Sequence, residues 1–454
     1  MAWIWIWVTS LLSSIPGFIS RLYTLFNPPH SSKSTTAIRL ALLGASNIAP
    51  MAVINPAVSH PDVIITAVAA RDKSKAEAYA KKHNIPIVHA TYDALLEDPT
   101  IDAVYIALPN GLHAEWALKA LRAGKHVLLE KPSTSNGAEA RLLFNSSILD
   151  QPSAPVLLEA FHYRFHPAFS VFKALVGDPG NIERASARGF LPRYTFALDD
   201  IRFKYDLAGG ALMDLGTYTV SWLRHVMEAE PEECIAASYT PMPAGYVASE
   251  PHTELGMKAA WRFPGGAVGD IDAHLGSTGG APWRWLLPGF LAKWLPTFEA
   301  PYIRVELKDS LATGESSVTL ADGEEHRVKR TVTFWVPIMP VLWHRIDVEE
   351  EHTIIRGSSN NPASSSSTPL RTWHTYSSTK AYQWPDGERK GEAWWSTYRH
   401  QLEEFVNAIK KRQGSGVWIS RADSVAQMDM IDSAYRRAGL RLRTSRLIDS
   451  DASM

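Results

Sequence analysis

Aliphatic runs alternate with helical patterns across the first third of the chain. The aliphatic runs are 37–43, 63–70, 101–108 and 127–129, and the helical patterns are 74–82 and 115–123. A strand of a buried parallel sheet shows no polar alternation, because helices cover both faces of the sheet. Strands that alternate with helices predict a doubly wound Rossmann domain, with its ligand outside the carboxyl ends of the strands.

The first aliphatic run ends in the turn Gly44-Ala45-Ser46-Asn47-Ile48-Ala49. A dinucleotide-binding turn has glycines at its first, third and sixth positions. Only the first matches here, so the turn alone fits an ordinary strand–helix connection equally well. Among alternating strands and helices, it predicts a helix start whose free N–H groups bind a pyrophosphate. The residues expected at the dinucleotide are Gly44, Ser46, Asn47 and Ile48.

Cofactor choice depends on the residue that follows the second run. An NAD site usually has a carboxylate there for the ribose hydroxyls, whereas an arginine suits a 2′-phosphate. This chain has Arg71 at that position, followed by Asp72. The pattern predicts NADP as the cofactor, with NAD as the alternative. The structural alternative is that Arg71 is a solvated residue at the start of a helix and that Asp72 is the N-cap of that helix.

A lysine follows the strand at 127–129, in the order Glu130-Lys131-Pro132. Because ligands bind at the carboxyl ends of parallel strands, Lys131 is predicted to hydrogen-bond the oxygen of a reacting alcohol or carbonyl. The alternative is a surface lysine before a proline.

Asp214 and Tyr218 are four residues apart in 211–227, a stretch with helical apolar spacing, so they share one helix face. Oxidation of an alcohol needs a base, and an unperturbed phenol has a pKa of about 10. We therefore predict that Lys131 favours the phenolate of Tyr218, and that Asp214 orients its partner. The alternative is a core tyrosine whose hydroxyl is satisfied by Asp214, with Lys131 or His162 as the base.

These motifs, in this order, resemble the glucose–fructose oxidoreductase / inositol dehydrogenase / MocA family, most closely its dihydrodiol dehydrogenase and NADP-dependent D-xylose dehydrogenase branch. Tyr218 fits that branch, since much of the family has histidine there. The segments that carry the resemblance are Gly44–Ala49, Ala70–Asp72, Pro109–His113, Glu130–Pro132, Glu159–Pro167, Gly209–Tyr218, Asp423–Asp432 and Tyr435–Leu440.

The resemblance implies an α/β Rossmann domain plus an α+β domain with a large open, mainly antiparallel sheet. It implies NADP-dependent oxidation of a sugar or cyclic diol hydroxyl, of the D-xylose 1-dehydrogenase or trans-1,2-dihydrodiol dehydrogenase type. The rival hypothesis is a catalytically silent member that acts as a cofactor-binding regulator or scaffold. Further residues expected beside the cofactor are Pro109, Asn110, His113, Glu130 and Lys131, and those expected at the substrate are Tyr163, Arg164 and His166. A structural role is the alternative for His113 and for the three substrate candidates.

The expected organisation has five parts. They are an apolar segment at 1–36, the Rossmann domain at 37–154, the substrate and oligomerisation domain at 155–392, helices at 393–442 that pack on the Rossmann domain, and a tail at 443–454. The family's sheet domain forms a homodimer. Insertions at 277–301 and 357–372 interrupt this domain. They are expected to affect the shape of the substrate pocket and whether the family's dimer can form.

The composition of the chain limits which binding partners are expected. The 46 basic and 47 acidic residues nearly cancel, so nucleic acid is not an expected partner, and a small polyol is. A single cysteine, Cys234, fits a reducing, cytoplasmic setting, and the histidines lack metal-ligand spacing, so no metal is expected. Residues 1–26 are apolar without a basic start, which predicts a peripheral membrane or self-docking helix, with a signal anchor as the alternative.

Overall fold

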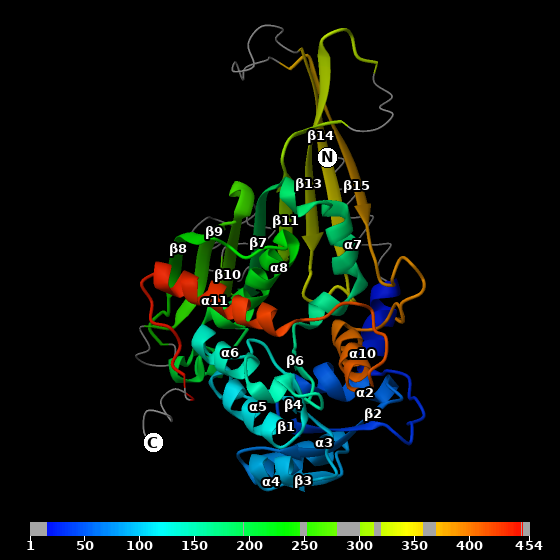
Figure 1. Cartoon of the computed structure of the whole chain (residues 1–454), viewed down its shortest axis with the longest axis vertical. Coiled ribbons are helices and arrows are strands. Elements are labelled where there is room, and N and C mark those ends of the chain that lie inside the picture. The colour runs from blue at the N-terminus through cyan, green and yellow to red at the C-terminus, as the bar shows by residue number, and fades with distance from the viewer. Residues whose placement is uncertain are drawn as a thin grey trace.

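The computed structural model describes residues 16–193, 195–245, 252–278, 300–312, 319–356, 369–445 and 447. Its first domain is built on a six-stranded parallel sheet with the order β3-β2-β1-β4-β5-β6 (Figure 1). The strands are β1 (Ile38–Leu43), β2 (Val63–Ala69), β3 (Ile87–His89), β4 (Ala103–Ile106), β5 (His126–Leu129) and β6 (Leu157–Glu159). The predicted Rossmann domain is confirmed.

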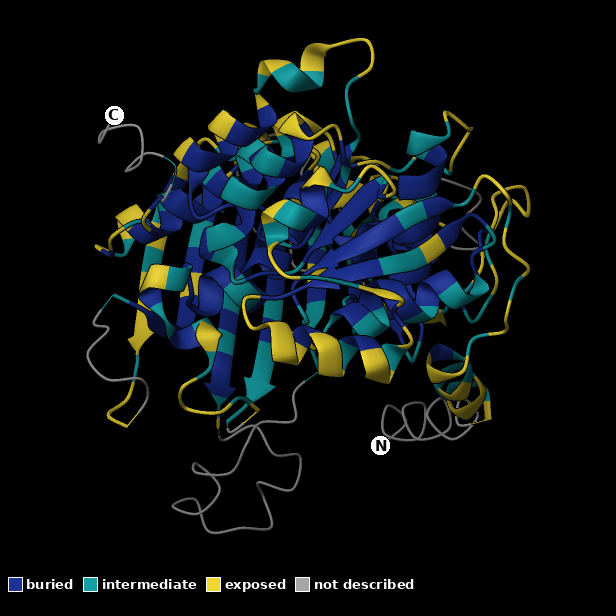
Figure 2. Cartoon of the chain, turned by 90° about the horizontal axis from the view of Figure 1, so that it is seen from below, coloured by how far each residue is buried: buried dark blue, intermediate teal, exposed yellow. Residues whose placement is uncertain are grey.

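Short helices connect these strands and cover the sheet. They are α2 (Asn55–Ser59), α3 (Lys73–His83), α4 (Tyr92–Glu97), α5 (His113–Arg122) and α6 (Gly137–Phe144). Strands β1, β4, β5 and β6 are almost wholly buried, whereas β3 at the edge of the sheet and the first half of β2 are partly exposed, as are the outer turns of the helices (Figure 2). Burial on both faces explains the unbroken aliphatic runs of the central strands.

The second domain is a nine-stranded, mainly antiparallel sheet, as the resemblance implies. Its order is β15-β14-β13-β11-β7-β10-β9-β8, with β12 paired to β13, and only β7 and β10 run parallel. The strands are β7 (Ile182–Pro192), β8 (Glu233–Pro241), β9 (Glu254–Arg262), β10 (Val268–Ser277), β11 (Tyr302–Leu307), β12 (Ser310–Leu311), β13 (Glu324–Trp335), β14 (Arg345–Arg356) and β15 (Arg371–Thr379).

Two helices, α7 (Pro167–Val176) and α8 (Thr217–Met227), pack on this sheet, α7 against β13 and α8 against β7 and β10. The face of α8 is apolar where it meets the sheet, and Trp222 and Leu223 are completely buried there. α8 therefore fixes the position of the segment that precedes it, which contains Asp214.

The carboxyl-terminal helices lie at the junction of the two domains (Figure 1). α10 (Thr397–Ile409) contacts α2 and the short turn His162–Phe165, and α11 (Arg421–Arg437) packs on α6, α8 and β8. Gln427 of α11 donates to the carbonyl oxygen of Thr217 at 2.8 Å. These helices thus join the domains around the start of α8.

Residues 16–26 form a helix that docks on its own chain. Arg21 donates to the carbonyl oxygen of Val341 at 2.7 Å and lies over the ring of Tyr382 at 3.8 Å. No helix among the described residues is long and apolar enough to cross a membrane. Residues 1–15 and most of both insertions, 277–301 and 357–372, lie outside the described residues, and the homodimer stays a prediction.

Candidate active site

The turn after β1 has the geometry of a phosphate-binding loop. Gly44 has a φ of +106°, and a Cβ there would lie 3.1 Å from the carbonyl oxygen of Ala107, so the turn requires glycine. The N–H groups of Ser46, Asn47 and Ile48 donate to no atom among the described residues. The Ser46 carbonyl is fixed by the Tyr79 hydroxyl at 2.9 Å. Free, fixed N–H groups at this position fit a pyrophosphate.

Arg71 follows β2 and is exposed, and it forms no ion pair with any described residue. Its backbone N–H donates to the hydroxyl of Tyr92. Asp72 accepts from the N–H groups of Ser74 and Lys75, so it is the N-cap of α3 and is not a ribose ligand. The guanidinium of Arg71 is therefore free to meet a phosphate.

His113, the first residue of α5, connects the loops after β4 and β5. Its Nδ1 lies 2.7 Å from the carbonyl oxygen of Pro132, and its Nε2 lies 2.8 Å from that of Leu108. Burial lowers the pKa of His113 to about 4, so the ring is neutral and donates to only one of them. These contacts fit the structural alternative for His113, and its place beside the cofactor stays a prediction. Asn110, which follows Pro109 in the same loop, donates to Ala208 of the second domain at 3.0 Å.

Glu130 lies beneath the lysine loop, and its carboxylate forms hydrogen bonds only within that region. Its Oε1 accepts from the hydroxyl of Tyr105 at 2.7 Å, and its Oε2 accepts from the N–H of Lys131 at 3.2 Å. Burial raises the pKa of Glu130. Through these contacts the carboxylate supports the lysine loop, and its place beside the cofactor stays a prediction.

Lys131 and Asp214 meet in a nearly buried ion pair. The Nζ of Lys131 lies 3.1 Å from Oδ1 of Asp214, and the two side chains are 12% and 19% exposed. Asp214 lies in a π-helical turn, Leu212–Gly216, which leads directly into α8; such turns are frequent at functional sites. The structure thus brings together two of the three predicted catalytic residues from different domains.

Arg202 is a second partner of Asp214 that the sequence analysis missed. Its Nε donates to Oδ2 of Asp214 at 3.1 Å. Burial by itself raises the pKa of Asp214, but the charges of Lys131 and Arg202 outweigh burial and hold that pKa below its usual value. Asp214 is therefore an ionised residue that fixes Lys131, as predicted for an orienting group.

Tyr218 lies close to this pair, but its hydroxyl bonds elsewhere. The Nζ of Lys131 lies 4.7 Å from the centre of the Tyr218 ring, and the hydroxyl is 2.9 Å from Nε2 of His162. Tyr398 of α10 also hydrogen-bonds this hydroxyl and raises the pKa of Tyr218 further. Asp214 is not the partner of the hydroxyl.

The predicted phenolate is not what the structure favours. Burial raises the pKa of Tyr218 well above 10, and the neighbouring Tyr398 and Glu130 add to the increase. Lys131 faces the ring of Tyr218 and not its oxygen, which explains why the ammonium does not offset burial. Tyr218 is a protonated phenol in this arrangement, suited to give a proton.

The three predicted substrate residues are buried and bonded to other parts of the chain. The Tyr163 hydroxyl lies 2.8 Å from Oγ of Ser221, Arg164 pairs with Asp423, and His166 accepts from the N–H of Ala168 at the start of α7. All three residues are less than a tenth exposed. These contacts fit the structural alternative, although Nε of Arg164 and Nε2 of His166 have no hydrogen-bond partner among the described residues, and the substrate role stays a prediction.

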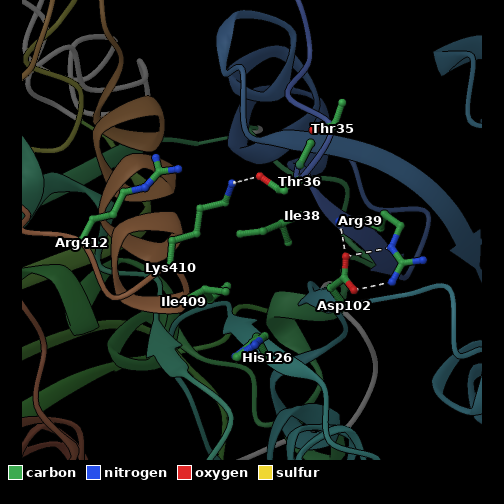
Figure 3. A pocket seen from close by; sticks show the side chains of 10 residues that line it. Thr35, Thr36, Ile38, Arg39, Asp102, His126, Ile409, Lys410 and Arg412 are labelled. Carbon is green, nitrogen blue, oxygen red and sulfur yellow. Dashed lines mark hydrogen bonds and ion pairs between the residues drawn. The ribbon is translucent and has the colours of Figure 1, made fainter.

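A cavity of about 750 Å³ lies at the opposite end of the Rossmann sheet, near the first residues of β1 and β5 (Figure 3). Arg39 forms a two-point ion pair with Asp102 on its wall, and Lys410 bonds Thr36 at 3.2 Å. Its cations are neutralised by carboxylates, and it is remote from the carboxyl ends of the strands. This cavity is not the active site. No group of three metal-ligand side chains occurs within the described parts of the chain.

The fold and the turn after β1 place the chain in the Rossmann class of dinucleotide-binding folds. The family "Oxidoreductase family, NAD-binding Rossmann fold" matches residues 38–146, and the "GFO/IDH/MocA C-terminal domain" matches residues 175–289. A dTDP-3,4-didehydro-2,6-dideoxy-alpha-D-glucose 3-reductase of Saccharopolyspora spinosa is 33% identical over 241 residues, which are 53% of this chain and 68% of that protein. The chain belongs to the Gfo/Idh/MocA oxidoreductase family.

Other relatives match over a shorter stretch. A D-xylose 1-dehydrogenase (NADP(+)) of Haloferax volcanii is 41% identical over 183 residues, 40% of this chain and 55% of the relative. A trans-1,2-dihydrobenzene-1,2-diol dehydrogenase of Xenopus laevis is 35% identical over 184 residues, 40% and 53% of the two chains. The chain thus spans about half of the length of the first curated relatives that it matches.

Solved structures share the fold. The 3-ketoreductase KijD10 of Actinomadura kijaniata, in complex with NADP and TDP-benzene, has a TM-score of 0.61 and 20% identity. An aldose-aldose oxidoreductase of Caulobacter crescentus has a TM-score of 0.60 and 17% identity. Each comparison covers 89% of this chain and 98% of the other, so both domains and their arrangement are common to these proteins.

Proposed function

We propose that this chain is an NADP-dependent oxidoreductase that transfers hydride between the cofactor and a hydroxyl-bearing carbon of a sugar or cyclic diol. The observation that carries the proposal is the Lys131–Asp214 pair beside the Tyr218 ring, immediately after β5. In the sheet, β5 is two strands from β1 and its Gly44 turn. A dinucleotide bound at that turn extends along the carboxyl ends of these strands, towards Lys131.

Arg71 supports NADP over NAD. Its guanidinium follows β2 and has no carboxylate partner among the described residues, and Asp72 is already occupied as a helix cap. A guanidinium binds phosphate oxygens through two parallel hydrogen bonds, whereas a ribose diol favours a carboxylate. The relative from Haloferax volcanii is named as an NADP(+) enzyme, which agrees with this preference.

Lys131, Asp214 and Tyr218 have separate roles in the proposed reaction. A bound nicotinamide supplies or accepts the hydride. Lys131 donates a hydrogen bond to the reacting oxygen, where negative charge develops in the transition state. Asp214, held by Arg202, keeps the ammonium of Lys131 in place. Tyr218 exchanges the proton with the reacting oxygen.

The protonation state of Tyr218 affects which direction of the reaction is favoured. A phenol that carries its proton at neutral pH is ready to donate it, which is the step that carbonyl reduction requires. In the oxidative direction the same group must accept a proton, so its phenolate must form first. We therefore expect both directions to be catalysed, with reduction favoured at neutral pH and oxidation accelerating as the pH rises.

The proposed substrates are D-xylose-like aldoses or trans-dihydrodiols. Both have adjacent hydroxyls, so one can react at Lys131 while its neighbour is held by polar groups. The named activities of the relatives from Haloferax volcanii and Xenopus laevis support these classes.

The proposal is tested with purified protein, by following NADPH absorbance with a panel of aldoses, dihydrodiols and their carbonyl products. Turnover with at least one polyol or its ketone, and a preference for NADP over NAD, is the expected result. The rival regulator hypothesis predicts that the protein binds NADP with ordinary affinity and turns over no member of the panel in either direction.

A further inference from the structure

The hydroxyl of Tyr218 is the end of a buried chain of polar groups that continues through His162 and Thr397. Tyr218 Oη lies 2.9 Å from Nε2 of His162, and Nδ1 of His162 lies 2.7 Å from Oγ1 of Thr397. That threonine oxygen is 3.8 Å from the sulfur of Met339. The side chains of His162, Thr397 and Tyr218 are each buried, and the ring of Tyr398 stacks on His162 with 3.9 Å between centroids.

His162 is neutral in this setting and carries a single ring proton. Burial, together with the charge of Lys131, lowers its pKa to about 3. The proton therefore lies either on Nδ1, so that the Tyr218 hydroxyl donates to His162, or on Nε2, so that His162 donates to Tyr218. In the first case the phenol proton points towards His162. In the second case it is left for the oxygen of Tyr398 or, once one is bound, for a substrate.

The far end of the chain selects between these tautomers. Thr397 has one hydroxyl proton and two potential acceptors, the sulfur of Met339 and the imidazole Nδ1. A thioether is a weak acceptor, whereas an unprotonated imidazole nitrogen is a good one. Donation from Thr397 to Nδ1 leaves the ring proton on Nε2, directed at the oxygen of Tyr218.

We propose that His162 is a positioning residue that donates its Nε2–H to Tyr218, so that the phenol proton faces the substrate and the phenolate left after proton transfer is stabilised. This inference rests on the proposed function. In the reductive step the O–H bond of Tyr218 breaks and the O–H bond of the product forms. The phenolate then accepts from His162 Nε2–H.

His162 keeps its proton throughout this step. Because the chain ends at the Met339 sulfur, which carries no proton, Thr397 has no source from which to replace a proton passed to His162. After the product has left, Tyr218 must regain its proton from the side on which the substrate binds. The histidine therefore acts as a fixed hydrogen-bond donor, and not as a proton relay.

Two substitutions separate this role from packing. His162→Gln places an amide N–H near the position of Nε2, whereas His162→Leu fills the space without a donor. Loss of a hydrogen bond to a charged group in the transition state lowers a rate by about 10–100-fold. We therefore expect His162→Leu to lower kcat by that factor and His162→Gln to retain most of the parent's kcat. The KM for NADPH and the melting temperature serve as controls, and both should stay close to those of the parent.

The Tyr218→Phe background tests whether His162 acts through Tyr218. Without a phenol oxygen there is nothing to orient, so His162→Leu should cost no further activity in that background. Equal losses for the Gln and Leu variants, or the same fold loss in the presence and absence of Tyr218, would show a merely structural role and overturn the proposal.

The tautomer can also be read without turnover. In protein labelled with ¹⁵N-histidine, the His162 signal, assigned by its loss in His162→Gln, should show a protonated Nε2 and an unprotonated Nδ1. A protonated Nδ1 overturns the inference. This measurement needs no substrate, so it tests the tautomer even if the protein turns over no polyol. An absence of turnover would count against the proposed function and not against the tautomer.

Discussion

Replacement of Lys131 by methionine removes the ammonium and keeps the length of the side chain. Among the described residues, Lys131 donates only to Asp214, through its carboxylate and its carbonyl oxygen, each at 3.1 Å. The substitution therefore removes the group expected to contact the reacting oxygen, while the Gly44 turn and Arg71, which are expected to bind the dinucleotide, are untouched. We predict a loss of turnover with retained NADP binding.

The magnitude follows from two contributions. A positioned proton-transfer or hydrogen-bonding group contributes about 10²–10⁴-fold to the rate, and that is the expected loss in kcat. At 3.1 Å the attraction between Lys131 and Asp214 is about 5 kcal/mol for an effective dielectric constant of about 20. Arg202 lies at the same distance from Asp214, so the carboxylate stays neutralised, and we expect a stability loss of only about 1–3 kcal/mol.

The assay combines steady-state kinetics, NADP titration by fluorescence and thermal unfolding. Lys81→Met, which changes an exposed lysine of α3, is the matched control and should leave all three unchanged. A Lys131→Met protein that is folded, binds NADP and keeps kcat within about threefold of the parent would refute the assignment, because no contribution of the expected size could then come from Lys131.

Three further predictions concern the cofactor, the proton and the fold. Arg71→Ala should weaken NADP binding and leave NAD binding nearly unchanged, and equal losses for both cofactors would contradict the 2′-phosphate assignment. Tyr218→Phe should fold normally and lose the rise in oxidation rate at alkaline pH; combined with Lys131→Met it should be little worse than Lys131→Met alone, and additive losses would rule out a coupled pair. Burial raises the pKa of Glu159 to about 7, so the folded state binds more protons than the unfolded state between about pH 4.3 and 7, and stability falls as the pH rises through that window. Glu159→Gln should therefore raise the melting temperature at pH 8 relative to the parent, with little difference at pH 4, and an unchanged melting temperature at both would show that Glu159 is ionised without cost.

The Rossmann domain and the position of Lys131 were predictable because both depend on local patterns. The strands of a two-face buried sheet are aliphatic throughout, and chain order then places Lys131 at the carboxyl end of β5. The spacing of Asp214 and Tyr218 correctly indicated a helical segment. The π-helical turn between them carries no recognised sequence signal.

The surroundings of Tyr218 were not predictable, because they come from distant segments. Arg202 lies in a single 3₁₀ turn, Ile201–Phe203, and Thr397 and Tyr398 begin a helix about 180 residues after Tyr218. The contacts of the substrate candidates were not predictable for a related reason. Polar residues such as Arg164 look like ligands in a sequence, but in the fold they pair with helix residues such as Asp423. Only the tertiary structure distinguishes these two uses.

The central claim is that this site moves hydride between a substrate carbon and NADP. The most direct test uses an aldose or dihydrodiol deuterated at the reacting carbon, with mass spectrometry of the NADPH formed. The account predicts one deuterium on the reduced nicotinamide, and a loss of that product in Lys131→Met. A protein that binds NADP but forms no deuterated NADPH from any member of the panel, or a Lys131→Met variant that forms it at the parent's rate, would contradict the account.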